Sequence, residues 1–205
     1  MFKIEHFGNF KPKGKQKIKK QIILSHTSRE VEEYLTSLNF RHNQKFDRIP
    51  NFVVTKWGKI YQLLPETTHS HFFSIDNINR NSVIVCLENL GWLEKKPLGN
   101  HYINWKGSIY TDKVYEKKWR DFFFWEPYPS NQIEATANLC SLLAENLDIK
   151  KRCIGHNTKI EGIEKYEGIV SRSNFSSSYT DLNPSFNFEF FEKLLENEQF
   201  TQREI

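Results

Sequence analysis

The sequence predicts an α/β fold in which a mixed central β-sheet is flanked by helices. Short apolar runs typical of buried strands alternate with segments whose apolar residues recur at helical spacing. The 205 residues suit one domain with its own core. No apolar run approaches the roughly 20 residues that cross a bilayer, so membrane insertion is not expected.

The first strand and helix are predicted from adjacent patterns. The run Gln-Ile-Ile-Leu-Ser at 21–25 suits a strand buried on both faces. Thr27 and Glu30 then form a capping-box pattern ahead of apolar residues at positions 31, 34, 35 and 38. We expect a helix that follows the strand directly.

A hairpin and a central strand come next. The runs at 52–54 and 60–63 flank Trp57 and Gly58, a pair suited to a tight turn. The run Ser-Val-Ile-Val-Cys-Leu at 82–87 is strongly β-forming and apolar throughout. It therefore predicts a strand in the middle of the sheet.

An aromatic segment at about 92–128 is predicted to be an irregular insertion. It contains a possible hairpin around Lys106-Gly107 and the tryptophans at 92, 105, 119 and 125. Sugar rings stack on indole faces, so these side chains suit a glycan-binding wall. They suit an additional hydrophobic cluster equally well.

The C-terminal third is predicted to be helical with two short connections. Ser130 begins a helix with a clear apolar face, and 184–195 predicts a closing helix. The short apolar run at 152–155 reads as a strand, and the serine-rich stretch at 171–179 reads as a loop.

The net charge of +4 is concentrated in six lysines between positions 11 and 20. We interpret residues 1–20 as a basic N-terminal arm, either solvated or attracted to polyanions, ahead of a single catalytic domain at 21–205. The three cysteines at 86, 140 and 153 have no CxxC spacing, which argues against a disulfide framework and a cysteine zinc site.

Polar residues follow three of the apolar runs. His26, Glu88 and His156 stand at the ends of strand-like segments, where side chains from distant strands converge in open α/β sheets. Asp181 follows a polar loop and supplies a carboxylate for the same rim. Two histidines and one carboxylate form a common catalytic zinc set, although a lone histidine at a strand end is more often structural.

Five motifs in order carry a resemblance to a known family: Ile-Ile-Leu-Ser-His-Thr at 22–27, Phe-Val-Val at 52–54 with Gly58, Val-Cys-Leu-Glu at 85–88, Ile-Gly-His at 154–156, and Thr-Asp at 180–181 with Pro184 and Phe186. From about Gln21 to Leu195 the chain resembles zinc-dependent N-acetylmuramoyl-L-alanine amidases of the type found in phage endolysins and peptidoglycan-recognition proteins. The resemblance implies hydrolysis of the amide between N-acetylmuramic acid and L-alanine in peptidoglycan.

The resemblance implies a role for each matching residue. His26, His156 and Asp181 would hold Zn²⁺, and Glu88 would act as general base or orient a ligand. Tyr179 stands where relatives carry a lysine, so it would donate a hydrogen bond to the oxyanion or pack in its loop.

Four further residues are expected to bind substrate, the first three because of the resemblance. One of His69 and His71 would contact the stem peptide, unless both are surface histidines. Asn81 matches an asparagine ahead of the family glutamate. Trp92 belongs to the proposed glycan wall.

The functional expectation is therefore a monomeric zinc amidase acting on peptidoglycan, most similar to a phage endolysin. Without a signal-peptide pattern it is expected to be cytoplasmic as made and to act on the wall after release. A peptidoglycan-binding receptor without activity is the alternative. A nucleic-acid partner is not expected, because no recognised motif supports one.

Overall fold

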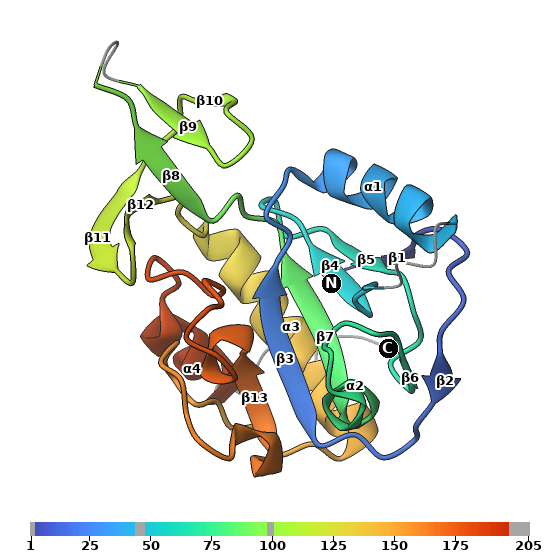
Figure 1. Ribbon diagram of the computed structural model, residues 1–205. Coiled ribbons are helices and arrows are strands. Elements are labelled where there is room, and N and C mark those ends of the chain that lie inside the picture. The colour runs from blue at the N-terminus through green and yellow to red at the C-terminus, as the bar shows by residue number, and fades with distance from the viewer. Residues whose placement is uncertain (1–2, 44–47, 98–100, 197–205) are drawn as a thin grey trace.

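The computed structural model describes residues 3–43, 48–97 and 101–196. Positions 1–2, 98–100 and 197–205, which belong to the predicted arm, insertion and C-terminal end, lie outside the described residues, as do 44–47. Within these ranges the chain forms a large sheet between helices and a smaller sheet that projects from it (Figure 1). The predicted α/β class with a mixed central sheet is confirmed.

The central sheet has six strands in the order β1-β5-β4-β7-β3-β13. Strand β3 pairs in parallel with both β7 and β13, while β4 and β5 form the predicted antiparallel hairpin. The positive φ of +82° at Gly58 allows the tight turn of that hairpin. The strands are β1 (Ile4–His6), β3 (Gln21–His26), β4 (Phe52–Val54), β5 (Ile60–Gln62), β7 (Ser82–Leu87) and β13 (Gly168–Ser171).

Alternation of side chains along the central strands creates two separate cores. Ile22 and Leu24 pack with α3 (Ser130–Leu147) and α4 (Phe188–Glu196) on one face. Ile23 packs with α1 (Val31–Asn43) and α2 (Asp76–Asn81) on the other. A strand buried on both faces must be apolar at every position, which explains the continuous apolar runs.

The length of helix α3 agrees with its role in packing. Helix α3 is the longest, and its buried face includes Ile133, Leu139 and Leu143. Across the described ranges, no helix has both the length and the apolar character to cross a membrane.

The N-terminal lysine-rich segment is part of the fold, so the prediction of a separate solvated arm was wrong. Strand β1 extends the central sheet, and β2 (Gly14–Lys15) pairs with β6 (Thr68–His69). Lys19 is buried, and its ammonium donates hydrogen bonds of 2.9–3.1 Å to the carbonyl oxygens of Thr68, Arg80 and Ser82. The number of lysines in the sequence did not reveal the buried position of Lys19, because a buried lysine needs acceptors that only the folded chain supplies.

The aromatic segment is an ordered antiparallel sheet, so its predicted irregularity was also wrong. Its strand order is β10-β9-β8-β12-β11, and β9 and β10 form the expected hairpin. The strands are β8 (Trp92–Lys95), β9 (Tyr102–Asn104), β10 (Ile109–Tyr110), β11 (Tyr115–Trp119) and β12 (Phe122–Trp125). Figure 1 shows this sheet projecting from the body of the molecule.

The C-terminal region differs from the prediction at the point that matters for the site. The run at 152–155 forms only an isolated bridge between Cys153 and Ile169. The strand beside β3 is β13, followed by the 3₁₀ turn η2 (Arg172–Asn174); a further turn, η1 (Ile163–Lys165), precedes it. The stretch predicted as a loop from 171 therefore starts inside the sheet.

Replacing Lys19 by methionine should destabilise the fold. Three carbonyl oxygens would lose a charged donor, which should lower the free energy of unfolding by about 2 kcal/mol or more. Lys20→Met is the matched control, because Lys20 is exposed and makes only a 3.8 Å ion pair with Glu167. Urea unfolding monitored by circular dichroism measures both variants, and equal midpoints would contradict the role of Lys19.

Candidate functional site

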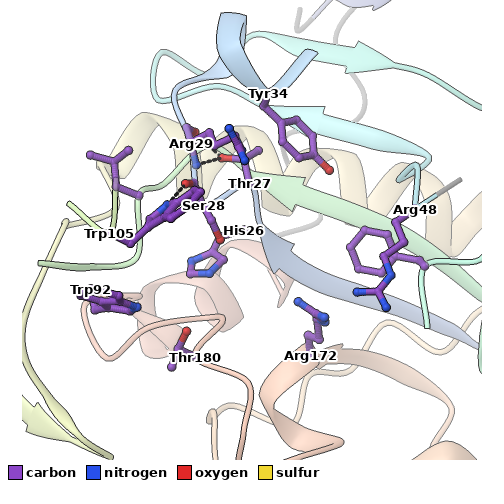
Figure 2. A pocket seen from close by; sticks show the side chains of 12 residues that line it. His26, Thr27, Ser28, Arg29, Tyr34, Arg48, Trp92, Trp105, Arg172 and Thr180 are labelled. Atoms are coloured by element: carbon purple, nitrogen blue, oxygen red, sulfur yellow. Dashed lines mark hydrogen bonds between the residues drawn. The ribbon is translucent and has the colours of Figure 1, made fainter. Parts of the chain in front are cut away.

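A cleft of about 510 Å³ lies at the C-terminal end of β3. Its lining combines His26 with three arginines, Arg29, Arg48 and Arg172, and with the indoles of Trp92 and Trp105 (Figure 2). The tryptophans come from the projecting sheet. His26 ends β3, Arg29 and Arg172 follow β3 and β13, and Arg48 precedes β4. The cleft thus lies at the strand ends where α/β folds bind ligands.

His26 ends β3 and is fixed by its neighbours. The side chain is buried, and Gly91 packs so closely that a Cβ there would lie 2.8 Å from the His26 Cε1 atom. Burial lowers the pKa of His26, with Asp181 raising it and Arg172 lowering it further. The imidazole is therefore neutral at pH 7, and its Nδ1 atom is buried without a hydrogen-bond partner among the described residues.

Asp181 lies beneath the cleft and is almost completely buried. Its Oδ2 atom accepts a hydrogen bond from the Ser25 hydroxyl and lies 3.6 Å from Nη1 of Arg172. Its carbonyl oxygen accepts a 2.7 Å hydrogen bond from the Ser173 amide. Side chain and backbone together hold this carboxylate beside the end of β3.

Arg172 follows β13 directly and extends toward the same centre. Its guanidinium lies 3.9 Å from the ring centroid of Tyr179 and 5.5 Å from that of Phe72. Burial opposes the charge, but Asp181 and Tyr179 more than offset it and raise the pKa of Arg172. The centre therefore contains a permanent positive charge.

His156 is not part of this centre, which corrects the expected ligand set. It lies exposed on a loop, where its Nδ1 atom accepts a 3.2 Å hydrogen bond from the Thr158 amide. The reason is the strand assignment: the residue that leaves the sheet beside His26 is Arg172, at the end of β13.

The residues present do not fit a zinc ion. In the parts of the chain that the structure describes, no three His, Cys, Asp or Glu side chains come together to hold a metal. His26 and Asp181 are neighbours of a guanidinium, which has donors but no lone pair for a metal. Burial raises the pKa of the nearby Cys86 to about 12, so this thiol supplies no thiolate at neutral pH.

Glu88 has a structural position that differs from the expected general base. Its two carboxylate oxygens accept 2.9 Å hydrogen bonds from the amides of Val31 and Lys56, so it fixes the start of α1 to the β4–β5 turn. Burial raises its pKa despite these bonds. Glu88 is not among the residues that line the cleft. Tyr179 packs against the guanidinium of Arg172.

Three of the four predicted substrate-binding residues lie outside the cleft lining. His69 is buried in β6 against Gly14, and the exposed His71 lies 3.2 Å from the Lys13 ammonium. Asn81 ends α2 ahead of β7, at the opposite end of the strand from His26. The structure places only Trp92 of this group in the cleft.

The sequence analysis missed the arginines and the position of Trp105. The indole of Trp105 donates a 2.6 Å hydrogen bond to the Ser28 carbonyl, and the Arg29 guanidinium lies 5.0 Å from its ring centroid. The available signal for Arg172 was the short run Gly-Ile-Val-Ser at 168–171, which precedes it directly. Two tryptophans thus form a wall, whereas Trp125 belongs to a buried cluster.

The sheet, its helices and a cleft at the strand ends define an α/β protein with a ligand site at the edge of its central sheet. The chain belongs to the N-acetylmuramoyl-L-alanine amidase family, whose sequence model matches residues 14–168. That match ends before Arg172 and Asp181. Family and fold support peptidoglycan amidase activity for the chain.

Solved structures share the fold at low identity. The amidase LysC from Clostridium intestinale URNW has a TM-score of 0.57 at 12% identity, over 95% of this chain and 98% of that one. The endolysin amidase LysCS from the same organism has 0.53 at 12%, over 94% and 95%. Staphylococcus aureus hydrolase AmiA has 0.53 at 11%, over 94% and 81%. A search of curated protein sequences finds no match.

Gly91→Ala should displace His26. The added methyl group would meet the imidazole at 2.8 Å, at a backbone φ of +84°. Gly107→Ala is the matched control, because its φ is +83° but nothing lies within 4 Å of the added Cβ. Both variants should lose about 1 kcal/mol from backbone strain, and only Gly91→Ala should shift the His26 ring resonances by NMR. Identical spectra around His26 would contradict the packing described.

Proposed function

We propose that the cleft binds the junction between N-acetylmuramic acid and the stem peptide of peptidoglycan, and that the reaction there is hydrolysis of the amide to L-alanine. The observation that carries this proposal is the cleft itself. It combines two indole walls with three guanidinium groups at the strand ends of a fold that belongs to the amidase family.

The indole walls suit the sugar. Trp92 stacks on Phe122 with ring centroids 4.7 Å apart and an interplanar angle of 13°, and Trp105 is tied to the Ser28 carbonyl. Both side chains are therefore held in place before a ligand arrives. An apolar sugar face can stack on an indole without the cost of ordering a loose side chain.

The polar groups of the cleft suit the peptide. Stem peptides carry carboxylates, and guanidinium groups bind carboxylates with two parallel hydrogen bonds. His26 is neutral at pH 7, and its imidazole can accept a proton from water or a substrate group. A bound zinc ion would activate water, but the described side chains at this centre do not fit one.

A second candidate function is binding of muropeptides without hydrolysis. It is favoured by the ion pair of Arg172 and Asp181, which places a guanidinium beside the two residues that were expected to hold zinc. A protein of this kind would keep the cleft and its walls but release no product.

The biological setting is also a proposal. We propose a monomer that is made in the cytoplasm and reaches the wall after release, as in phage lysis; one protein that shares the fold is named an endolysin amidase. Two alternatives can be tested separately. The effect of chelator tests whether the activity depends on zinc, and the products test whether the chain acts on wall fragments in recycling.

Digestion of purified peptidoglycan, followed by mass spectrometry, tests the proposed reaction. We expect new L-alanine amino termini without new reducing sugars, and loss of product in His26→Ala but not in His156→Ala. Activity that disappears with chelator would restore a metal-dependent mechanism. Tight wall binding without any product would support the second candidate and contradict hydrolysis.

Removing either wall of the cleft should weaken peptidoglycan binding. Trp92→Ala and Trp105→Ala should each reduce affinity in a sedimentation assay by about tenfold, equivalent to about 1.4 kcal/mol. Trp57→Ala is the control, since this indole is 85% exposed and lies outside the cleft lining. An equal effect of all three substitutions would argue against a glycan wall.

A further inference from the structure

Arg172 lines the cleft and forms an ion pair with Asp181, which lies beneath it. Strand β13 pairs in register with β3, with Ser171 opposite Leu24, so Arg172 leaves the sheet beside the end of β3. The side chains of Arg172 and Asp181 are 19% and 2% exposed. Figure 2 shows Arg172 and His26 extending from different segments toward the same space.

A guanidinium excludes a metal ion from such a centre. It presents N–H donors, has no acceptor, and stays charged at every physiological pH. A divalent cation bound by His26 and Asp181 would meet this charge at the distance of an ion pair. The positive charge that would balance Asp181 in a metal site is already supplied by the protein.

The guanidinium is also held in place from its faces. The ring of Tyr179 lies 3.9 Å from its central carbon, and the rings of Phe72 and Phe73 lie 5.5 and 5.8 Å away. These contacts favour the charged, planar group of an arginine. They indicate a built position for the cation and not a side chain that happens to lie near Asp181.

Polar atoms at this centre are not fully paired. The Nε atom of Arg172 and the Nδ1 atom of His26 are both buried without a hydrogen-bond partner among the described residues. The 3.6 Å separation from Asp181 is longer than a hydrogen bond. Buried polar atoms are normally satisfied, so two such atoms beside one cleft indicate a polar centre that the described side chains leave incomplete.

The charge of the lining identifies the kind of ligand. Arg29 and Arg48 join Arg172 in the lining, and although Arg29 is paired with Glu33, no carboxylate is among the described residues that line the cleft. A ligand with an anionic, planar acceptor group complements this arrangement. A carboxylate matches the paired donors of a guanidinium in both charge and geometry.

We propose that the guanidinium of Arg172 takes the place of a metal cation beside His26 and Asp181, and that it binds a carboxylate of the stem peptide. The identity of the ligand rests on the proposed function. The replacement of the metal rests on the geometry of the three side chains.

Zinc retention tests the replacement. The purified chain and its variants are incubated with zinc, desalted, and measured by atomic emission, with circular dichroism to confirm folding. The unmodified chain should retain no zinc, whereas Arg172→His should retain about one ion per chain, because the third ligand is then present. Adding Asp181→Asn should abolish that gain, and adding His156→Ala should leave it unchanged.

Two results would overturn the replacement. One is stoichiometric zinc in the unmodified chain that His26→Ala removes. The other is a folded Arg172→His variant that gains no zinc.

Calorimetry with two muramyl dipeptides tests the carboxylate. They differ only in whether the second residue is D-glutamate or its α-amide, D-isoglutamine. The unmodified chain should bind the acid about tenfold more tightly, Arg172→Gln should lose this preference, and Arg172→Lys should retain part of it. Equal affinity of the unmodified chain for both dipeptides would overturn the carboxylate contact. Absence of binding to either would contradict the proposed function, while the zinc result still decides the replacement.

Discussion

The parallel pairing of β3 with β7 on one side and β13 on the other is the constraint on which the rest of the structure depends. Parallel strands end at the same edge, so the residues that follow them meet there although they are far apart in the sequence. This pairing brings His26 and Arg172 together, and the segment after η2 returns Asp181 to the same point. Any shift of β13 by one residue would turn Arg172 toward the opposite face.

The buried charge of Asp181 is the second constraint, and its partners connect the strands to the cleft. Asp181 is stable in its buried position because Ser25 and Arg172 compensate its charge. Removing one partner of such a pair leaves an uncompensated charge, which costs more than the pair itself contributes. The side chains of Asp181, Ser25 and Arg172 therefore depend on one another. Replacing one of them changes the charge balance and hydrogen bonding of the other two.

The projecting sheet contributes to the cleft from two directions. Trp105 donates to the Ser28 carbonyl on the side of β3, and the Arg120 guanidinium donates to the carbonyls of Ser176 and Ser177 in the segment that leads to Asp181. The insertion thus joins both sides of the cleft, while Leu93 and Tyr110 pack with Leu90 in a small interior of its own. Its aromatic residues therefore supply both a wall of the cleft and a hydrophobic cluster, the two roles that the sequence left open.

The sequence by itself determined the elements that depend on local pattern. The apolar runs of β3 and β7, the β4–β5 turn at Gly58 and the apolar face of α3 follow from periodicity and turn chemistry, and the family followed from motifs in order. Tertiary structure alone decided which strand lies beside β3, because the short runs at 152–155 and 168–171 each contain only two apolar side chains and neither pattern favours pairing with β3. That choice placed Arg172 where His156 was expected. Contacts with other distant segments buried Lys19 and placed Glu88 at the start of α1. Long-range pairing and the compensation of buried charge depend on contacts between distant segments, and no local pattern records them.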